Sequence, residues 1–241
     1  MVFYYIYLFL IALPLLLACT IVAAILTIIG SMIGFSRSMG YYPGHVWARI
    51  FCFLCLVRIK VHGKENISKK TSYVFVANHQ GAFDIFTIYG YLGHNFRWMM
   101  KKSLEKIPLV GYACRTAGHI YVDNSRPSAV RETMETAEKR LAGGMSVVVF
   151  PEGSRTRDGK MHQFRRGAYA LAVEFALPVV PLTIDGAYHV MPRGRNLPRP
   201  GKIPLTIHNP IYPAEGSTHD LASIMEESYR VIASALPENQ A

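Results

Sequence analysis

Charged side chains are scarce in this sequence, and the first 36 residues contain none. Only 17% of the 241 residues are Asp, Glu, Lys or Arg, whereas 51% are hydrophobic. This balance excludes a disordered chain and indicates that part of the protein meets lipid. The cysteines, at positions 19, 52, 55 and 114, are too scattered for a disulfide framework. No internal repeat or low-complexity tract is visible, so we expect one domain, residues 61–241, behind a membrane anchor, residues 1–60.

The uncharged run at the start of the chain is too long for a simple membrane crossing. As a helix it would extend ~54 Å at ~1.5 Å per residue, beyond the ~30 Å of bilayer hydrocarbon. We therefore expect one tilted or bent membrane helix with an interfacial start, and Pro14 is placed to bend it. Four aromatic residues suit a position among the lipid headgroups: Phe3, Tyr4, Tyr5 and Tyr7.

A cleaved signal sequence is the alternative for this run, because Leu16 to Cys19 resembles a lipoprotein processing box. No Lys or Arg precedes that box, however, and the apolar run continues for seventeen residues after Cys19. Both features oppose cleavage. We expect the segment to be retained.

Basic residues follow the uncharged run before any acidic residue occurs. They are Arg37, Arg49, Arg58 and Lys60, and the first acid is Glu65. The positive-inside rule then predicts a membrane protein whose main domain lies on the cytoplasmic side. Residues 46–59 are apolar with two spaced arginines, which predicts an interfacial helix. Cys52 and Cys55 within it are expected to be reduced thiols that fill apolar space.

The rest of the chain alternates short β-rich runs with helical patterns. Expected strands are 73–77, 96–100, 119–123, 146–150, 178–184 and 203–207, and expected helices are 85–92, 127–141, 167–175 and 217–235. The last helix opens with Ser217 and Asp220 in capping-box spacing. This order predicts an α/β fold with a mixed, largely parallel sheet flanked by helices.

The string Asn78 to Asp84 lies between an expected strand and an expected helix. A turn through Gly81 can bring the carboxylate of Asp84 back to the imidazole of His79. The carboxylate would then fix the ring tautomer and leave the second nitrogen free as a general base. No G-x-S-x-G nucleophile motif is present in the domain, so this pair indicates direct activation of a substrate hydroxyl or of water.

A second polar string, Phe150 to Lys160, also follows an expected strand. Its glycine allows a ligand close to the backbone, and its arginines can bind phosphate. The candidate binding residues are Glu152, Gly153, Ser154 and Arg155. The spacing is not that of a P-loop, and a solvated basic loop that contacts lipid headgroups is the alternative. An anionic partner fits the net charge of +10.

These two strings, in this order, resemble the glycerolipid acyltransferase family. That family has an NHxxxxD block, here Asn78 to Asp84, and an EGxR block, here Glu152 to Arg155. A proline-bearing apolar block corresponds to residues 177–181. In the remaining block, residues 118–124, Asn124 stands where the family usually has Arg. The resemblance runs from about residue 61 to about residue 212.

The resemblance implies an O-acyltransferase of phospholipid biosynthesis. A fatty acyl group would pass from acyl-CoA or acyl carrier protein to the sn-2 hydroxyl of 1-acyl-glycerol-3-phosphate, without an acyl-enzyme. His79 and Asp84 would be catalytic, residues 152–155 would hold the acceptor, and Lys101 and Lys102 would add positive charge. No cofactor, metal ion or nucleic acid is expected.

Three alternatives stay open at this point. The acceptor could be another lysolipid, such as a lyso-ornithine lipid, or glycerol 3-phosphate. The same His-Asp pair could also hydrolyse an acyl thioester. Finally, a non-catalytic scaffold or nucleic-acid binder would explain the basic charge, although the domain lacks the interleaved aromatic and basic residues of a binding platform.

Overall fold

The computed structural model describes residues 1–123, 126–213, 220–238 and 240. A seven-stranded sheet in the order β1-β7-β6-β2-β5-β3-β4 forms its centre. The strands are β1 (Val57–His62), β2 (Val74–Ala77), β3 (Phe96–Lys101), β4 (Ile120–Val122), β5 (Ser146–Val149), β6 (Val179–Ile184) and β7 (Gly201–Ile207).

The sheet is mixed but largely parallel, as the sequence predicts. Strands β6, β2, β5, β3 and β4 pair in parallel with one another, β7 is antiparallel to β6, and β1 is parallel to β7. The carboxyl ends of β2, β5 and β3 therefore lie at one edge of the sheet. Because polar loops follow all three of these strands, this edge is where side chains from distant sequence positions can meet.

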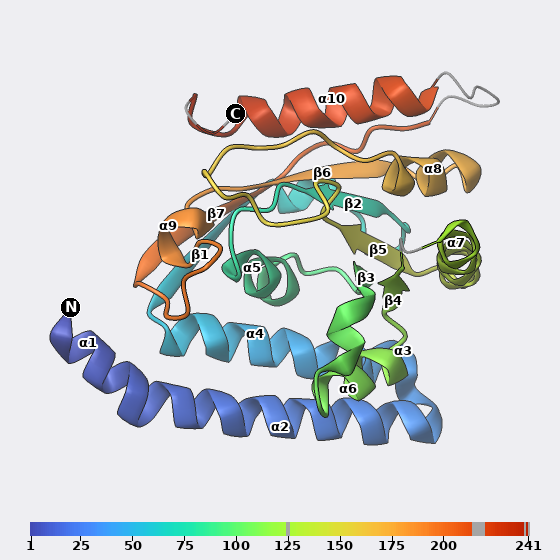
Figure 1. The fold of residues 1–241 in the computed structure, drawn as a ribbon. Coiled ribbons are helices and arrows are strands. Elements are labelled where there is room, and N and C mark those ends of the chain that lie inside the picture. The colour runs from blue at the N-terminus through green and yellow to red at the C-terminus, as the bar shows by residue number, and fades with distance from the viewer. Residues whose placement is uncertain (124–125, 214–219, 239, 241) are drawn as a thin grey trace.

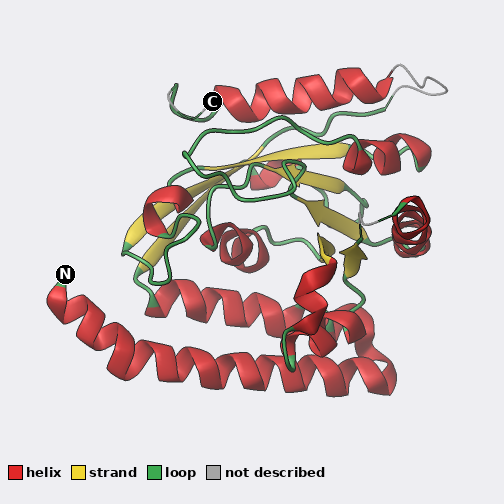
Figure 2. Cartoon of the chain, viewed as in Figure 1, coloured by secondary structure: helices red, strands yellow, loops and turns green. Residues whose placement is uncertain are grey.

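Helices cover both faces of the sheet in layers (Figures 1 and 2). On one face lie α5 (Phe83–Tyr91) and then α4 (Tyr42–Leu54), with α9 (Ala187–Val190) near the sheet edge. On the other lie α7 (Pro127–Ala142), α8 (Gly167–Glu174) and α10 (Asp220–Ser234). The hydrophobic core is accordingly divided by the sheet into two clusters.

A long apolar helical run, Val2–Met39, is present where the bent membrane helix is predicted, and it is interrupted at Gly34, where φ is +97°. The run is long and apolar enough to cross a membrane, and its membrane placement stays a prediction. It consists of α1 (Val2–Tyr7), a π-helical turn (Leu8–Ala12), α2 (Leu13–Gly30), a second π-helical turn (Ser31–Phe35) and α3 (Ser36–Met39). Pro14 lies in the first turn of α2, directly after the first π-helical turn. Proline has no backbone N–H, so the usual helical hydrogen bond from position 14 is missing, and a π-helical turn accommodates this loss. Both features favour a bend at this point.

The long helix runs alongside α4 instead of projecting away from the domain (Figure 1). The indole N–H of Trp47 in α4 donates to the hydroxyl of Thr20 in α2 at 2.9 Å. At the start of the run, the hydroxyls of Tyr4 and Tyr7 donate to the carbonyls of Cys55 and Leu54, each at 3.1 Å. Both hydroxyls thus satisfy carbonyls at the end of α4, and the position among lipid headgroups predicted for these tyrosines stays a prediction.

We call residues 2–54, the long apolar helix packed against α4, the N-terminal hairpin. Its far end, where the long helix meets α4, is held by a buried arginine. The guanidinium of Arg97, at the start of β3, donates to the carbonyls of Ser36 at 2.8 Å and of Arg37 at 3.2 Å. Burial lowers the pKa of Arg97 to about 10. Hydrogen bonds thus join the long helix to the α4 segment at its start and in its middle, and Arg97 joins its far end to β3.

The helix predicted over residues 46–59 is confirmed only for its first part. Helix α4 ends at Leu54, and Val57 already begins β1, which pairs in parallel with β7 from Val57 to His62. The alternating exposure of β1 shows an edge strand with one buried face. Its partner lies some 140 residues away in sequence, so pairing with β7 outweighs the local helical pattern, and the strand crosses the boundary predicted at residue 60.

The other predicted elements are confirmed to within three residues at each end, as far as they are described. Within the described chain, the elements not predicted are β1, α6 (Val110–Thr116), α9 and two short 3₁₀ helices, Lys64–Asn66 and Lys102–Lys106. Ser217, the predicted cap of the last helix, lies outside the described residues.

Candidate functional site

Two neighbouring parallel strands position the candidate residues. Strand β2 ends at Ala77, two residues before His79, and β5 ends at Val149, three residues before Glu152. The two loops are joined by a hydrogen bond from the Thr156 N–H to the His79 carbonyl at 2.9 Å. Residues some seventy positions apart in sequence therefore share one site at the carboxyl edge of the sheet.

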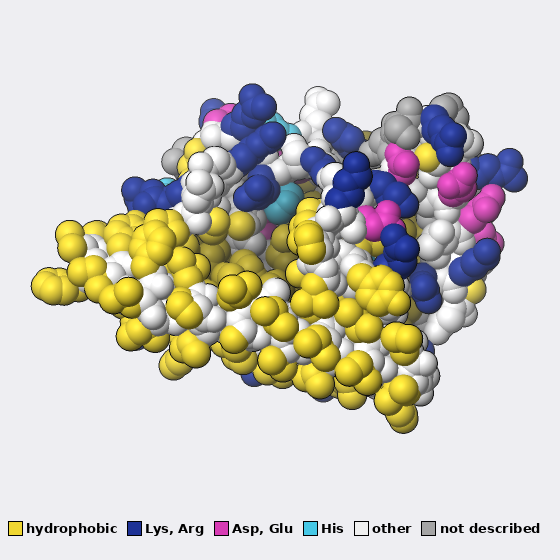
Figure 3. All heavy atoms as spheres, turned by 60° about the horizontal axis from the view of Figure 1, so that its bottom comes forward, with side chains coloured by type: hydrophobic (Ala, Val, Ile, Leu, Met, Phe, Trp, Pro, Cys, Tyr) yellow, Lys and Arg dark blue, Asp and Glu magenta, His cyan; other side chains and the backbone are white. Residues whose placement is uncertain are grey.

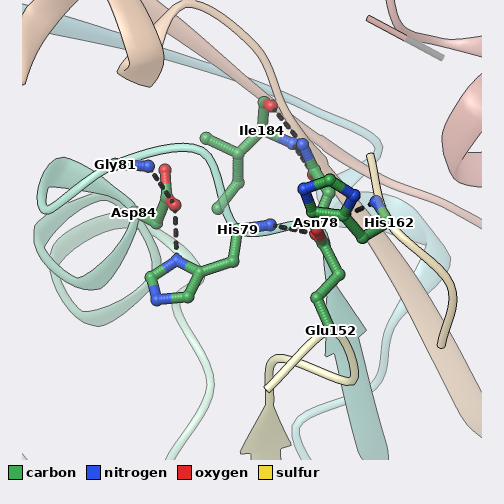
Figure 4. Close-up of polar contacts among 7 residues, drawn as sticks. All are labelled: Asn78, His79, Gly81, Asp84, Glu152, His162 and Ile184. Carbon is green, nitrogen blue, oxygen red and sulfur yellow. Dashed lines mark hydrogen bonds and ion pairs between the residues drawn. The ribbon is translucent and has the colours of Figure 1, made fainter. Parts of the chain in front are cut away.

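His79 and Asp84 form the predicted pair (Figure 4). His79 Nδ1 lies 2.7 Å from Oδ2 of Asp84, and the same oxygen accepts the Gly81 N–H at 2.8 Å. The Asp84 side chain is fully buried at the first turn of α5, whereas that of His79 is 13% exposed. Because the carboxylate accepts a proton from Nδ1, the Nε2 of His79 carries a lone pair, and within the described chain no residue bonds to it.

The imidazole of His79 is held flat against an aromatic ring. Phe150 stacks on it with ring centroids 3.8 Å apart and an interplanar angle of 10°. Trp98 in β3 in turn stacks on Phe150 at 5.7 Å. Together with Asp84, this wall fixes the ring in both position and rotation, which is what a general base requires.

Asn78 closes the turn from the other side. Its side-chain amide donates to the Ile184 carbonyl and its oxygen accepts the Ile184 N–H, both at 2.8 Å. Ile184 is the last residue of β6, so this pair of bonds ties the ends of β2 and β6 together (Figure 4). The turn that carries His79 is therefore anchored to both neighbouring strands.

Glu152 does not face an open binding site. Its Oε1 accepts the His79 backbone N–H at 2.7 Å and its Oε2 accepts the His162 N–H at 3.0 Å, and the residue is 6% exposed (Figure 4). Burial raises the pKa of the Glu152 carboxyl to about 7, and the negative charge of Asp84 acts in the same direction. The two backbone N–H groups oppose that rise. Glu152 is thus placed to position the His79 turn, and its predicted contact with the acceptor stays a prediction.

The residues after Glu152 have the properties expected of an anion site. Gly153 has φ of +75°, and a Cβ there would approach the guanidinium carbon of Arg165 to 2.9 Å. Ser154 and Arg155 are half-buried, and their side chains have no hydrogen-bond or ion-pair partner within the described chain. A half-buried loop arginine with free donors beside the His79 turn can bind a phosphate in bidentate fashion.

Lys101 and Lys102 lie at the end of β3, one strand beyond β5. The ammonium of Lys102 pairs with Glu105 at 2.9 Å and lies over the Tyr121 ring. Lys101 is exposed and no described residue pairs with its ammonium. Of the two, Lys101 is the free cation at this edge. Asn124, the residue that departs from the family pattern, lies outside the described residues.

The surface around the site has an apolar region and a basic region. Figure 3 shows apolar side chains covering the face formed by the N-terminal helices, with Lys and Arg side chains beyond them. Histidine surface shows in a hollow between the two regions. Among the described residues, no group of three or more His, Cys, Asp or Glu side chains is arranged to hold a metal ion.

Three sets of contacts at the site were not predicted from the sequence: those of Phe150, Trp98 and Asn78. The position of Phe150 could have been predicted from the alternation of side chains along a strand. Val148 and Phe150 lie on the same face of the strand that leads into the second motif. The bonds of Asn78 and Glu152 go to backbone groups of distant residues. No local pattern indicates such partners.

Comparison with known proteins agrees with this arrangement. The family model described as Acyltransferase matches residues 58–185, which is more than half of the chain. A chloroplast 1-acyl-sn-glycerol-3-phosphate acyltransferase of Brassica napus is 30% identical over 204 residues, 84% of this chain and 57% of the relative. The mouse 1-acyl-sn-glycerol-3-phosphate acyltransferase alpha is 30% identical over 180 residues, 74% of this chain and 63% of the relative.

A solved structure is also similar. The 1-acyl-sn-glycerophosphate acyltransferase PlsC of Thermotoga maritima superposes with a TM-score of 0.69 at 33% identity, covering 79% of this chain and 77% of that one. The chain spans between half and three fifths of the length of the first two plant relatives it matches.

Proposed function

The chain belongs to the acyltransferase family, and from that premise we propose that it transfers a fatty acyl group to the free sn-2 hydroxyl of 1-acyl-glycerol-3-phosphate. The product would be phosphatidic acid. The relatives whose names specify an acceptor support this choice. Acyl-CoA or acyl carrier protein would supply the acyl thioester.

The observation that carries the proposal is the His79–Asp84 pair with one ring nitrogen left free. The carboxylate of Asp84 holds the Nδ1 proton, and the stacked Phe150 ring fixes the plane of the imidazole. Nε2 is then the acceptor for a substrate proton. The described site offers no Ser, Cys or Thr hydrogen-bonded to the imidazole, which supports direct attack by the acceptor without an acyl-enzyme.

The proposed reaction has two steps, an addition and an elimination, and the protons balance over the two. His79 Nε2 takes the proton of the acceptor hydroxyl as its oxygen bonds to the thioester carbonyl carbon. The tetrahedral intermediate then collapses, the carbon–sulfur bond breaks, and the departing thiolate takes the proton from the imidazolium. The ester and the free thiol leave, and the imidazole returns to its starting state. Holding both substrates against one ring provides much of the acceleration.

The phosphate of the acceptor would lie against the loop after Glu152. Arg155 offers a guanidinium without a partner in the described chain, and the guanidinium of Arg165 lies against the backbone at Gly153. Lys101 adds a second cation at the neighbouring strand end. Glu152 itself serves the turn of His79 through the backbone N–H, since a carboxylate would repel a phosphate.

The N-terminal hairpin would place this site at the membrane. It exposes large apolar side chains such as Leu17 and Ile29 along the length of α2, while the opposite side of α2 packs on α4. The domain holds this helix at both ends, through Arg195 to the Tyr5 hydroxyl and through Arg97 to the Ser36 carbonyl. A helix held in this way is not free to cross a bilayer alone, which supports insertion into one leaflet. The basic residues from Arg37 to Lys60 favour the cytoplasmic leaflet.

An acceptor panel tests the proposal. Purified protein in detergent is given labelled acyl-CoA or acyl carrier protein thioester, with 1-acyl-glycerol-3-phosphate, a lyso-ornithine lipid, glycerol 3-phosphate or no acceptor. We expect labelled phosphatidic acid only with the first acceptor. Transfer to a different acceptor would replace the substrate in the proposal, and release of free fatty acid without an acceptor would identify a thioesterase instead.

A further inference from the structure

A second apolar surface lies outside the N-terminal hairpin. Beyond residue 56, six large hydrophobic side chains of the described chain are exposed. Three of them fall between β3 and α6, and a fourth lies in the first turn of α6. They are Leu104 (40%), Ile107 (43%), Leu109 (38%) and Tyr112 (50%). We call residues 102–112 the apolar loop. Such a concentration is unusual for a surface in water and marks a contact with a partner or a membrane.

The apolar loop is held in one conformation. Leu109 has φ of +61°, and the Val110 N–H donates to the Pro108 carbonyl at 2.6 Å, which closes a strained γ-turn of the positive-φ type. The Gly111 N–H donates to the Ile107 carbonyl at 2.8 Å, and the Tyr121 hydroxyl donates to the Gly111 carbonyl at 2.8 Å. The outward position of the apolar side chains is therefore built into the fold. Backbone strain of this kind concentrates at functional contacts.

The loop is continuous with the apolar face of the N-terminal hairpin. Helix α6, which begins at Val110, packs against α2 (Figure 1). The loop also follows β3 directly, whose carboxyl end lies one strand from the Glu152 loop. It thus connects the proposed membrane face to the edge of the sheet that carries the site.

Cationic side chains surround the loop. Lys102, Lys106 and Arg115 are exposed, and the single acid, Glu105, is paired with both Lys102 and Arg115. Exposed apolar residues bordered by Lys and Arg complement a leaflet that contains anionic headgroups, in which long basic side chains extend to the phosphates. A protein partner that contributed a matching apolar surface would not need this excess of positive charge.

We propose that the apolar loop inserts into the same leaflet as the N-terminal hairpin and forms a second membrane contact next to the site. The occupant of this surface is an anionic phospholipid leaflet. This inference rests on the proposed membrane placement of the hairpin. The domain would then be held by two contacts, so its catalytic edge cannot rotate away from the lipid that carries the acceptor.

A depth measurement tests the inference without any assay of turnover. Ile107→Cys is labelled with an environment-sensitive fluorophore in the full chain in which Cys19 and Cys114 are serine. Cys52 and Cys55 are 0% and 1% exposed and should not react. On vesicles of phosphatidylcholine with phosphatidylglycerol, we expect a blue shift and quenching by spin-labelled lipid acyl chains. Glu174→Cys, at the exposed end of α8, is the matched control and should show neither effect.

Two results would overturn the inference. One is a label at residue 107 that stays in water while the protein cosediments with vesicles. The other is a blue shift that depends on protein concentration and not on spin-labelled lipid, since that would identify a second copy of the chain on the loop. Failure of the proposed acyl transfer would leave this readout unaffected, because it measures position alone.

A kinetic comparison adds an independent check. The double variant Ile107→Ser, Leu109→Ser should raise the apparent KM for a vesicle-borne acceptor about tenfold, equal to ~1.4 kcal/mol. The KM for the same acceptor dispersed in detergent should not change, because neither side chain contacts the site. An equal rise in detergent would show a structural effect on the site and would contradict a role in membrane contact.

Discussion

Glu152 connects the two sequence motifs through backbone bonds, and this position has a measurable pH signature. Its carboxyl pKa is raised from 4.5 to about 7 by burial, so the folded protein binds a proton more tightly than the unfolded chain between these values. Folding stability contributed at this position is therefore largest below 4.5 and declines as pH rises to about 7. Above that pH the buried carboxylate is ionised, and the two backbone N–H groups that donate to it partly offset the cost of burying its charge.

We expect Glu152→Gln to remove this pH dependence. As pH rises from about 5 to about 8, the wild type should lose up to ~3 kcal/mol of unfolding free energy relative to the variant, at ~1.4 kcal/mol per pKa unit. Denaturant unfolding at both pH values measures the difference. Glu174→Gln, at an exposed position, should show no such trend. A constant gap between wild type and Glu152→Gln would show that Glu152 does not titrate in this range.

Arg155 is the residue on which the acceptor phosphate should depend. A hydrogen bond to a charged group contributes ~1.5–3 kcal/mol, so Arg155→Ala should raise the KM for 1-acyl-glycerol-3-phosphate by at least about tenfold. The KM for the acyl thioester should change little. Arg131→Ala removes one cation on the exposed surface of α7 and serves as the control. Equal rises for both substrates would remove the phosphate-binding role.

At the scale of elements, the N-terminal hairpin is part of the domain structure as well as the proposed membrane anchor. Tyr4 and Tyr7 satisfy the last carbonyls of α4, Trp47 bonds to Thr20, and Arg97 holds the opposite end. Because β1 follows α4 after two residues, this packing also orients the edge of the sheet. The hairpin therefore fixes the angle between the membrane face and the site.

Removing the two tyrosine hydroxyls should loosen the start of the hairpin. Each hydrogen bond contributes about 1 kcal/mol, so Tyr4→Phe, Tyr7→Phe should speed amide hydrogen exchange over residues 2–12 by about tenfold or more. Tyr42→Phe is the control, because Tyr42 is 58% exposed and its hydroxyl has no bond within the described chain. Unchanged exchange in the double variant would show that the hairpin start is held by packing alone.

At the scale of the whole molecule, the sequence predicted those features whose causes are local. His79 and Asp84 are five residues apart and joined by a turn, so their contact could be expected from residue types and spacing. The layered α/β fold followed from alternating patterns. What could not be predicted depends on distant partners: β1 forms because β7 pairs with it, and Glu152 bonds to a backbone N–H 73 residues away.

The same contrast applies to the membrane face. An uncharged run of 36 residues indicates lipid contact, but it does not show that the helix lies along α4. Nor does the sequence show that Leu104, Ile107 and Leu109 are exposed, since the run from Ile107 to Val110 is an ordinary short apolar stretch. Only the turn geometry shows that they point outward beside the hairpin.

The most direct test of the account is acyl transfer by wild type, His79→Ala and Asp84→Asn in detergent with 1-acyl-glycerol-3-phosphate and an acyl thioester. Loss of the base should reduce kcat by a factor of about 10²–10⁴ or more, and Asp84→Asn should also reduce it because the ring tautomer is no longer fixed. Circular dichroism and vesicle binding should match the wild type. Near-normal turnover by a folded, membrane-bound His79→Ala protein would contradict the account.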